Sequence, residues 1–225
     1  MKPETRSRTI EVCRALVCFA LKEEAAAFKN LVRDRTDISV LITGIGQENS
    51  RRAVLERLKQ LTPQFVLTCG FAGGLCPKLA TGDVLFSTHD SNLNTKLTSA
   101  KAKAVKFLCV SRIATTGTEK AGLRRSSGAD AVEMESEAIQ QICRERELPC
   151  ATVRVISDAA NDDLPLDFNK LSKRDLSLDF GKLAWAIAKS PGKIPALLRL
   201  QKTSSRAAAN LADVLVKVTS PYPGS

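Results

Sequence analysis

The sequence predicts a layered α/β domain in which helices connect parallel strands. Short apolar segments rich in β-branched residues alternate with longer segments whose apolar residues recur at helical spacing. Several of the apolar segments run directly into glycines, which is common at the carboxyl ends of strands in such sheets. The chain has 225 residues, 44% of them hydrophobic and 26% charged, and this size and composition suit one globular domain.

Four apolar segments in the first half of the chain predict strands. They are residues 12–19, 38–43, 65–69 and 84–87. A helix should begin at Lys22, because the residues that follow the first strand have helical spacing. A second helix is expected over about 48–61, with Pro63 marking its end, since proline cannot continue a helix.

The second half continues the alternation with shorter elements. Residues 90–106 are polar, and we interpret them as a loop followed by a short helix. Beyond them we expect strands at 107–114, 129–134 and 151–156, and helices at 118–125 and up to Glu147. Strands that alternate with crossover helices in this way form a sheet in which they run parallel.

Residues 170–225 differ from the rest in charge, and we treat them as a basic helical C-terminal extension of a single 1–225 domain. They hold ten Lys or Arg residues and three Asp residues, about +7 of the net charge of +10. Helices are expected at 179–189 and 194–218, broken at 191–192. Their apolar residues could cap an edge of the sheet, or could form a basic amphipathic surface that binds anionic lipid.

The apolar runs and the cysteines narrow the class of protein. No apolar run approaches the roughly 18 residues of a membrane span. The short run at 15–21 follows a polar N-terminus and ends at Lys22, so we interpret it as a core strand rather than a signal peptide. The seven cysteines have no CxxC spacing, which predicts free thiols in a cytoplasmic protein.

Histidine and aromatic residues are scarce. His89 is the one histidine and has no partner motif nearby, so we expect neither a Ser-His-Asp arrangement nor a metal site. The net charge could attract nucleic acid, but 4% aromatic residues and the lack of a binding signature argue against that partner. Acid–base chemistry must therefore come from carboxylates.

The most informative stretch is 131–158, where acidic residues lie at both ends of a strand–helix–strand unit. Glu133 and Glu135 flank Met134 at one end, and the second strand closes at Asp158. Carboxylates that approach from two sides can bind one polar ligand. A sugar with vicinal hydroxyls and a basic leaving group is such a ligand.

Glycines and a second acid pair also follow predicted strands. The glycines at 44–46 and 70–74 allow backbone N–H groups to approach a ligand. Neither group is a GxGxxG motif or a P-loop, so dinucleotide binding and NTP hydrolysis are disfavoured. Glu23 and Glu24 suit either a helix cap or a site at the carboxyl end of the first strand.

Six motifs follow one another along the chain: ALKEE (20–24), TGIG (43–46), CGFAGG (69–74), TGD (81–83), VEME (132–135) and VRVISD (153–158). In this order they resemble the nucleoside phosphorylase and nucleosidase superfamily, nearest to its methylthioadenosine/S-adenosylhomocysteine nucleosidases. The resemblance covers about residues 12–163 and implies a three-layer αβα domain with a central mixed, mostly parallel sheet. The tail KSPGKIPALLRL (189–200) is similar to a smaller subgroup, the hopanoid-associated phosphorylases thought to act on adenosylhopane.

The resemblance implies a role for each acid. Asp158 matches the family's acid, which protonates or hydrogen-bonds the purine N7 as the base departs. Glu135 matches the carboxylate that accepts the ribose 2′ and 3′ hydroxyls, and Met134 the residue that packs against the sugar. Glu24 matches the base that activates the attacking water, so two carboxylates would act on opposite sides of the glycosidic bond.

The resemblance extends to five further residues. Arg154 and Ser157 match residues that orient the purine acid. Gly73 and Gly74 match positions where the backbone approaches the base or the ribose. Glu133, the other acid of the VEME motif, is grouped with the substrate-binding residues.

Two departures from the family pattern concern the nucleophile and the 5′ group. Phe71 stands where the family usually places a small hydroxyl residue, and a phenylalanine side chain cannot donate a hydrogen bond to phosphate or water. Gly46, Arg51 and Phe71 mark a candidate phosphate or water site, in which Arg51 is either an anion ligand or a solvated charge. The short segment 88–128 lacks a recognisable base-stacking phenylalanine, which suggests an opened 5′ side that suits a bulky apolar substituent.

We therefore expect an enzyme that cleaves the N-glycosidic bond of a 5′-substituted adenosine, with adenosylhopane as a candidate and water as the nucleophile. Two alternatives stay open: phosphorolysis to a sugar 1-phosphate, and a non-catalytic protein that binds a nucleoside or a lipid surface. The expected partners are the nucleoside, an anionic membrane surface at the C-terminal helices, and further copies of the chain in a homodimer or higher homo-oligomer. No cofactor, metal or nucleic acid is expected, and the expected location is the cytoplasm or the inner face of the membrane.

Overall fold

The computed structural model describes residues 11–171 and 189–221. The strands are β1 (Glu11–Phe19), β2 (Ile38–Ile42), β3 (Leu61–Gly74), β4 (Val84–Thr88), β5 (Lys103–Ala104), β6 (Phe107–Cys109), β7 (Ala131–Glu133) and β8 (Cys150–Asp158). The helices are α1 (Lys22–Leu31), α2 (Gln47–Arg57), α3 (Ser91–Ser99), α4 (Gly117–Ser127), α5 (Ser136–Glu145), α6 (Phe168–Leu171), the short 3₁₀ helix η1 (Pro191–Lys193) and α8 (Ile194–Thr219). Except for its last residue, the helix predicted at 179–189 lies outside the described residues.

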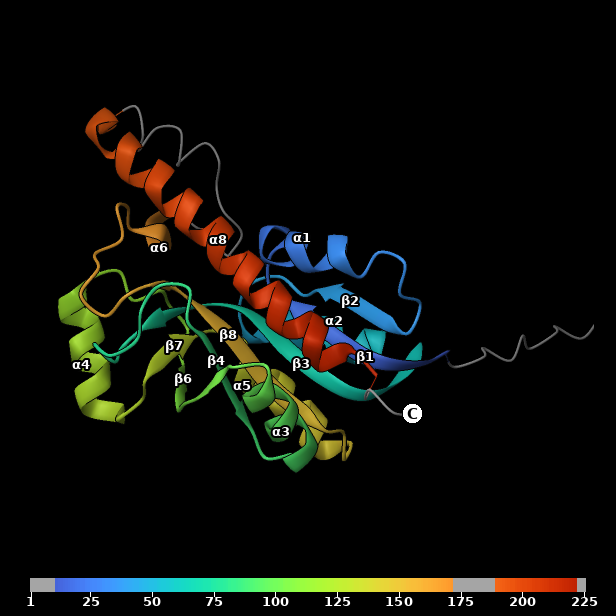
Figure 1. Ribbon diagram of the computed structural model, residues 1–225. Coiled ribbons are helices and arrows are strands. Elements are labelled where there is room, and N and C mark those ends of the chain that lie inside the picture. Colours follow the sequence, from blue (N-terminus) through green and yellow to red (C-terminus); the bar gives the residue numbers. More distant parts are fainter. Residues whose placement is uncertain (1–10, 172–188, 222–225) are drawn as a thin grey trace, which may run out of the picture.

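One mixed, mostly parallel sheet forms the centre of the fold (Figure 1). Its strands follow the order β2-β1-β3-β8-β4-β5, and β1 pairs in parallel with both β2 and β3, as β3 does with β8. The strand β4 runs antiparallel to β8, and β7 pairs antiparallel with the end of β3 and parallel with β6. The expected three-layer α/β architecture is thereby confirmed.

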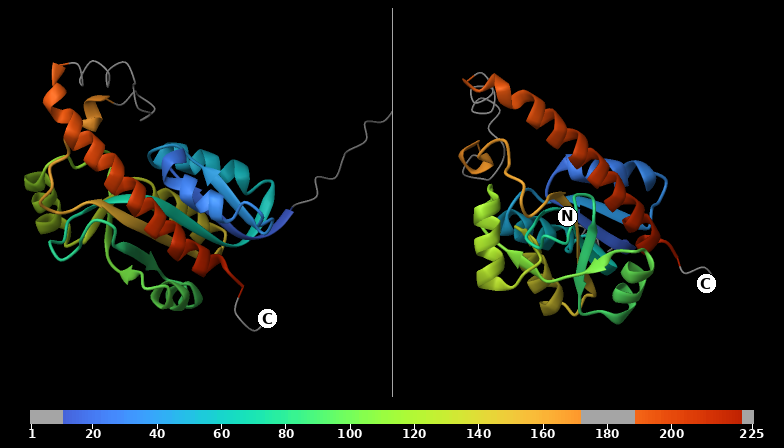
Figure 2. Two further views of the ribbon diagram at one scale, coloured as in Figure 1. Left: turned by 45° about the horizontal axis from the view of Figure 1, so that its top comes forward. Right: turned by 60° about the vertical axis from the view of Figure 1, so that its left-hand side comes forward.

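Helices cover both faces of this sheet (Figures 1 and 2). Successive residues of β1 point to opposite faces, so Leu16 packs in the cluster of α2 and α5, whereas Val17 packs in the cluster of α1, α3 and α8. Ile142 of α5 and Phe28 of α1 are fully buried in these two clusters. Burial on both faces explains why the sequence of β1 is apolar throughout rather than alternating.

The long helix α8 crosses the face of the sheet that carries α1 and α3 (Figure 2). Its second half is buried there, with Leu211, Leu215 and Val218 fully covered. Its first half extends beyond the sheet, and Ile194 and Leu198 are 40% and 60% exposed. Within the described part of the chain, no helix is both long and apolar enough to cross a bilayer.

The third strand is longer than predicted. The helix α2 ends at Arg57, and Pro63 lies inside β3 instead of ending a helix. Proline is tolerated there because β8 begins to pair with β3 only at Val66, so Pro63 has a strand neighbour on one side. At its far end β3 pairs with both β7 and β8, so the glycines at 70–74 belong to the strand and do not follow it.

The second half also departs from the prediction. The strand expected at 107–114 ends at Cys109, and the residues after it leave the sheet. The helix α3 begins directly after β4 rather than after a loop. Asp90 caps its N-terminus, because the Asp90 carboxylate accepts a 2.8 Å hydrogen bond from the Leu93 N–H. Leu93 and Leu97 are buried and pack this helix onto the sheet.

Candidate active site

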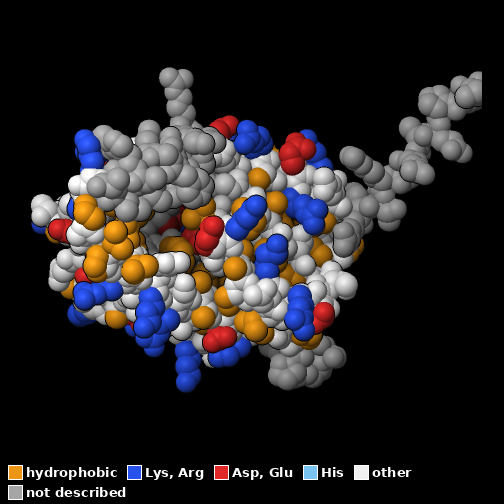
Figure 3. Space-filling view, turned by 90° about the horizontal axis from the view of Figure 1, so that it is seen from above, with side chains coloured by type: hydrophobic (Ala, Val, Ile, Leu, Met, Phe, Trp, Pro, Cys, Tyr) orange, Lys and Arg blue, Asp and Glu red, His pale blue; other side chains and the backbone are white. Residues whose placement is uncertain are grey.

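A cavity of about 260 Å³ lies at the carboxyl ends of β1, β3 and β8. The start of α1, the end of β7, residues 110–114 and the first half of α8 complete its wall. In Figure 3 acidic side chains are visible within this hollow, and apolar side chains lie along part of its rim. Ligands of α/β sheets bind at this edge because the strand ends and the loops after them meet there.

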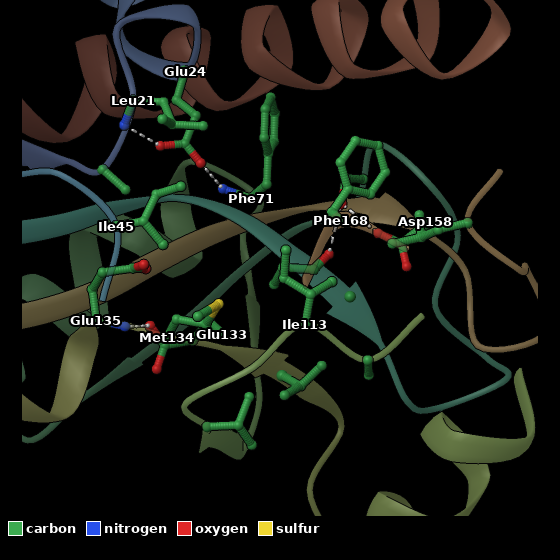
Figure 4. Close-up of a pocket in the computed structure, with 18 of the residues that line it drawn as sticks. Leu21, Glu24, Ile45, Phe71, Ile113, Glu133, Met134, Glu135, Asp158 and Phe168 are labelled. Atoms are coloured by element: carbon green, nitrogen blue, oxygen red, sulfur yellow. Dashed lines mark hydrogen bonds between the residues drawn. The ribbon is translucent and has the colours of Figure 1, made fainter. Parts of the chain in front are cut away.

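Glu24 extends from the first turn of α1 into the cavity (Figure 4). Its carboxylate accepts the backbone N–H of Leu21 and that of Phe71, each at 2.9 Å, so it both caps the helix and lies in the site. Burial raises the pKa of Glu24 to about 7, and the Glu135 carboxylate adds to this rise, whereas the Phe71 amide and Arg154 oppose it. A carboxyl group with a pKa near neutrality is suited to act as a general base.

A fully buried arginine joins the two acids of the VEME motif. The Arg154 guanidinium lies 2.6 Å from the Glu133 carboxylate and 3.2 Å from that of Glu135, and it donates to the Cys69 carbonyl at 3.1 Å. Glu133 also accepts the side-chain hydroxyl of Ser136 at 2.6 Å and two backbone amides at the start of α5. Its acceptor positions are thus used within the protein, which favours a supporting role for Glu133.

The two acids differ in their pKa. Burial would raise the pKa of Glu133, but Arg154 and the hydrogen bonds from Ser136 hold it below its ordinary value. Burial raises the pKa of Glu135, and the neighbouring Glu133 charge adds to the rise against the attraction of Arg154. Glu135 lines the cavity and is the acid of this pair with fewer partners in the protein.

Asp158 lies at the end of β8 on the opposite side of the cavity from Glu135 (Figure 4). The Ser157 hydroxyl donates to its Oδ1 at 2.6 Å, and the Lys120 Nζ lies 2.5 Å from its Oδ2. Lys120 was not predicted as a site residue, because it belongs to a basic helix and resembles a solvated charge in the sequence. The one available signal is Leu123, one turn further along α4, whose apolar contacts show that this face of the helix points inward.

The glycines allow β3 to pass close to its neighbours. A Cβ on Gly73 would lie 3.2 Å from the Val132 side chain and 3.4 Å from Asp158 Oδ2. A Cβ on Gly74 would lie 3.3 Å from the Asp158 carbonyl. Gly73 lines the cavity together with Met134, whereas Gly74 lies behind the wall.

Carboxylates occupy the backbone donors of the candidate phosphate or water site. The Gly46 N–H donates to Glu135 at 3.1 Å, and the Phe71 N–H donates to Glu24. Arg51 lies on α2 and is not among the residues that line the cavity. Two donors that could hold an anion are therefore already bound to negative groups.

The other part of the cavity wall is mostly apolar, although Arg112 and Ser204 also line it. Residues 110–114 form one side of it, and Phe168 and Leu200 contribute from α6 and α8. Asn169 fixes this arrangement, since its side chain both accepts the Ile113 N–H and donates to the Ile113 carbonyl, each at 2.9 Å. Phe168 was not predicted as a site residue, and its only signal in the sequence is that it is an aromatic residue between the polar residues Asp167 and Asn169.

Substitution of Gly70 by alanine should disrupt the acidic half of the cavity. The new Cβ would lie 2.6 Å from Arg154 Nη1 and 2.7 Å from Glu24 Oε1, and the backbone φ of 149° strains any other residue. We expect a loss of about 1–3 kcal/mol in the free energy of unfolding, the usual range for overpacking, measured by urea denaturation.

Gly122→Ala is the matched control for this prediction. Gly122 lies inside α4, and nothing stands within 4 Å of its added Cβ. Alanine should therefore stabilise the protein by about 0.5–1 kcal/mol. Equal stability of the two variants would contradict the close packing of Gly70.

Known proteins are similar to this chain in sequence. Residues 90–189 match the phosphorylase superfamily. The 5′-methylthioadenosine/S-adenosylhomocysteine nucleosidase of Glaesserella parasuis is 29% identical over 171 residues, 61% of this chain and 74% of that protein. The corresponding nucleosidase of Shewanella sediminis is 28% identical over 169 residues, 60% of this chain and 74% of that protein.

Solved structures share the fold at lower identity. The futalosine hydrolase of Helicobacter pylori has a TM-score of 0.66 and 17% identity, and the alignment covers 93% of this chain and 97% of that one. The Campylobacter jejuni 5′-methylthioadenosine/S-adenosyl homocysteine nucleosidase has a TM-score of 0.66 and 17% identity, with 92% and 98% covered. In sequence and in fold the chain is therefore similar to the nucleoside phosphorylase and nucleosidase superfamily, and among its members to the methylthioadenosine/S-adenosylhomocysteine nucleosidases.

Proposed function

We propose that this protein cleaves the N-glycosidic bond of a 5′-substituted adenosine and releases adenine. The observation that carries the proposal is that Glu24, Glu135 and Asp158 come from three separate elements and face one cavity. This arrangement provides a base, a carboxylate that binds the sugar hydroxyls and an acid beside the leaving purine. The named activity of the relatives, nucleosidase, is consistent with it.

Each acid has a distinct part in the proposed reaction. Glu24 takes a proton from the attacking water, Glu135 accepts the 2′ and 3′ hydroxyls of the ribose, and Asp158 meets N7 of the departing purine. Arg154 and Ser157 hold the last two acids in place, and Met134 packs against the sugar. Negative charge beside the ribose ring also stabilises the positive charge that develops there as the bond breaks.

Water suits the site better than phosphate does. Phosphate would need donors, but the Gly46 and Phe71 amides are bound to Glu135 and Glu24. Two carboxylates near this position would also repel a second anion. A neutral water molecule faces no such repulsion and can give its proton to Glu24.

The 5′ group of the substrate should be large and apolar. Ile113, Phe168 and Leu200 offer an apolar surface in the wall of the cavity. A hopanoid group attached to the 5′ carbon, as in adenosylhopane, has this chemistry. We include adenosylhopane in the proposed substrate class on that basis.

A panel of 5′-substituted adenosines tests the proposal, with adenine release measured in the presence and absence of phosphate. We expect release without phosphate, and faster release when the 5′ substituent is a long alkyl group than when it is a hydroxyl. Release that requires phosphate and yields a sugar 1-phosphate would instead identify a phosphorylase. Binding of the nucleosides without adenine release over hours would identify a non-catalytic protein.

Glu24→Gln should reduce turnover by about 10²-fold or more, the usual contribution of a general base. In the wild type, kcat/KM should fall about tenfold per pH unit below about pH 7, because Glu24 with a pKa of about 7 must be ionised to act. The variant should lose this acid limb. The measurement is a pH–rate profile of adenine release.

Glu23→Gln is the control for this variant, since Glu23 is the exposed neighbour in the same turn. It should leave both turnover and the pH profile unchanged. Near-full activity of purified Glu24→Gln would contradict the assignment of Glu24 as the general base.

We further propose that the first half of α8 binds the anionic lipids at the inner face of the cell membrane. Ile194 and Leu198 are exposed there beside basic side chains, and Leu200 of the same helix lines the cavity. A lipid-linked nucleoside could pass from the membrane along this helix into the site.

Co-sedimentation with vesicles checks this docking surface. The protein should sediment with anionic vesicles at low salt, and Leu198→Glu should weaken the association by about tenfold or more, in line with the cost of losing an apolar contact and adding a repelled charge. Val12→Glu is the control, because Val12 is an exposed apolar residue (75%) on β1 rather than on α8. No sedimentation of the wild type at low salt would refute the proposal.

A further inference from the structure

Lys120 is buried behind Asp158 on the side away from the cavity. It has no exposed surface, and it is not among the residues that line the cavity. Its Nζ lies 2.5 Å from Asp158 Oδ2 and donates to the backbone carbonyls of Ala159 and Asp162, each at 2.8 Å. A lysine ammonium has three hydrogens, and these three oxygens use all of them.

A buried charge at this position is not required to hold the turn after β8. That turn is already closed by its own hydrogen bonds, since the Asp162 side chain accepts the Ala159 N–H at 2.8 Å and the Asp162 N–H donates to the Ala159 carbonyl at 3.1 Å. A buried ion pair is also weak evidence of stabilisation, because the removal of both charges from water is costly. The pair is better explained by what it does for Asp158.

The pair resolves a difficulty in the proposed reaction. Asp158 accepts a hydrogen bond from Ser157 at Oδ1 and pairs with the Lys120 ammonium at Oδ2, so both of its oxygens act as acceptors in the resting site. The departing purine nevertheless needs a proton at N7. An ammonium beside a carboxylate contains the same number of protons as an amine beside a carboxylic acid, so the pair holds one proton that can be transferred.

We propose that Lys120 is a positioning residue that supplies this proton to the purine through Asp158. The inference rests on the proposed function. As the C1′–N9 bond breaks, its electron pair goes to the purine, Asp158 passes a proton to N7, and Lys120 Nζ gives its proton to Asp158. The water oxygen bonds to C1′ and its proton goes to Glu24. After the products leave, Lys120 regains a proton from solvent and Glu24 releases one, which restores the resting state.

Two substitutions of Lys120 test the inference on purified protein. Lys120→Met removes the proton, and Lys120→Arg keeps the charge but does not release a proton at neutral pH. Both should lower kcat for adenine release by about 10²-fold while KM changes by less than about threefold. Arg125→Met, which removes an exposed charge from the same helix, should leave kcat unchanged.

A substrate with a different leaving group distinguishes proton supply by Lys120 from a purely structural role of Lys120. A 4-nitrophenyl riboside with the same 5′ group needs no proton at N7, so both Lys120 variants should cleave it within about threefold of the wild-type rate. The Lys120→Met/Asp158→Asn double variant should release adenine at the rate of Asp158→Asn alone, because Lys120 acts only through the carboxylate. The rate of adenine release by this double variant is a second test, which does not need the riboside.

Several results would overturn the inference. Lys120→Arg with near wild-type adenine release would show that charge alone suffices. Equal slowing of both substrates, or a further loss when Lys120→Met is added to Asp158→Asn, would show that Lys120 only maintains the structure. If Lys120→Met does not fold, Lys120→Arg and the double variant decide the matter. A wild-type protein that releases no adenine from any nucleoside would refute the proposed function instead, which is a separate result.

Discussion

The buried guanidinium of Arg154 is the group on which the acidic half of the site depends. Glu24, Glu133 and Glu135 lie around it, and without a positive charge these carboxylates would repel one another in a space with little water. Arg154 sits on β8 and is fixed by the Cys69 carbonyl of β3, so the register of these two strands sets the position of the acids. Truncation of Arg154 would leave buried charges without a partner, which is among the most destabilising changes in a protein.

The same group separates the acids by their proton affinity. Arg154 lies close to Glu133 and lowers the pKa of that carboxyl. Its attraction does not offset the burial of Glu24, so the pKa of Glu24 rises to about 7. Pairs of carboxyl groups whose environments move their pKa values apart are typical of acid–base sites. A second ion pair, between Lys120 and Asp158, serves the opposite end of the cavity. Two of the three acids that face the ligand are thus paired with a buried cation, Glu135 with Arg154 and Asp158 with Lys120.

The apolar periodicity of the sequence predicted most strands and helices. The prediction was wrong where pairing between strands decided the structure. The strands β1, β2, β4 and β8 and the helices α1, α5 and α8 lie close to where the periodicity placed them. The prediction for β3 was too short because Pro63 and the glycines at 70–74 usually interrupt strands, and only its pairing with three other strands keeps it extended. Residues 110–114 include apolar residues typical of a strand, but after the Val110 N–H donates to the Glu133 carbonyl of β7 the segment leaves the sheet and lines the cavity.

The sequence by itself determined the fold class and placed acids at the carboxyl ends of predicted strands, and its resemblance to the nucleosidases singled out Glu24, Glu135 and Asp158 among them. Only the tertiary structure decided what surrounds them. Lys120 and Phe168 reach the cavity region from segments that carry no pattern of their own, through the packing of α4 and the Asn169 contacts of α6. Burial and pairing are properties of the assembled fold, and the sequence therefore could not indicate which acid would be neutralised, which would have a raised pKa and which would face a lysine.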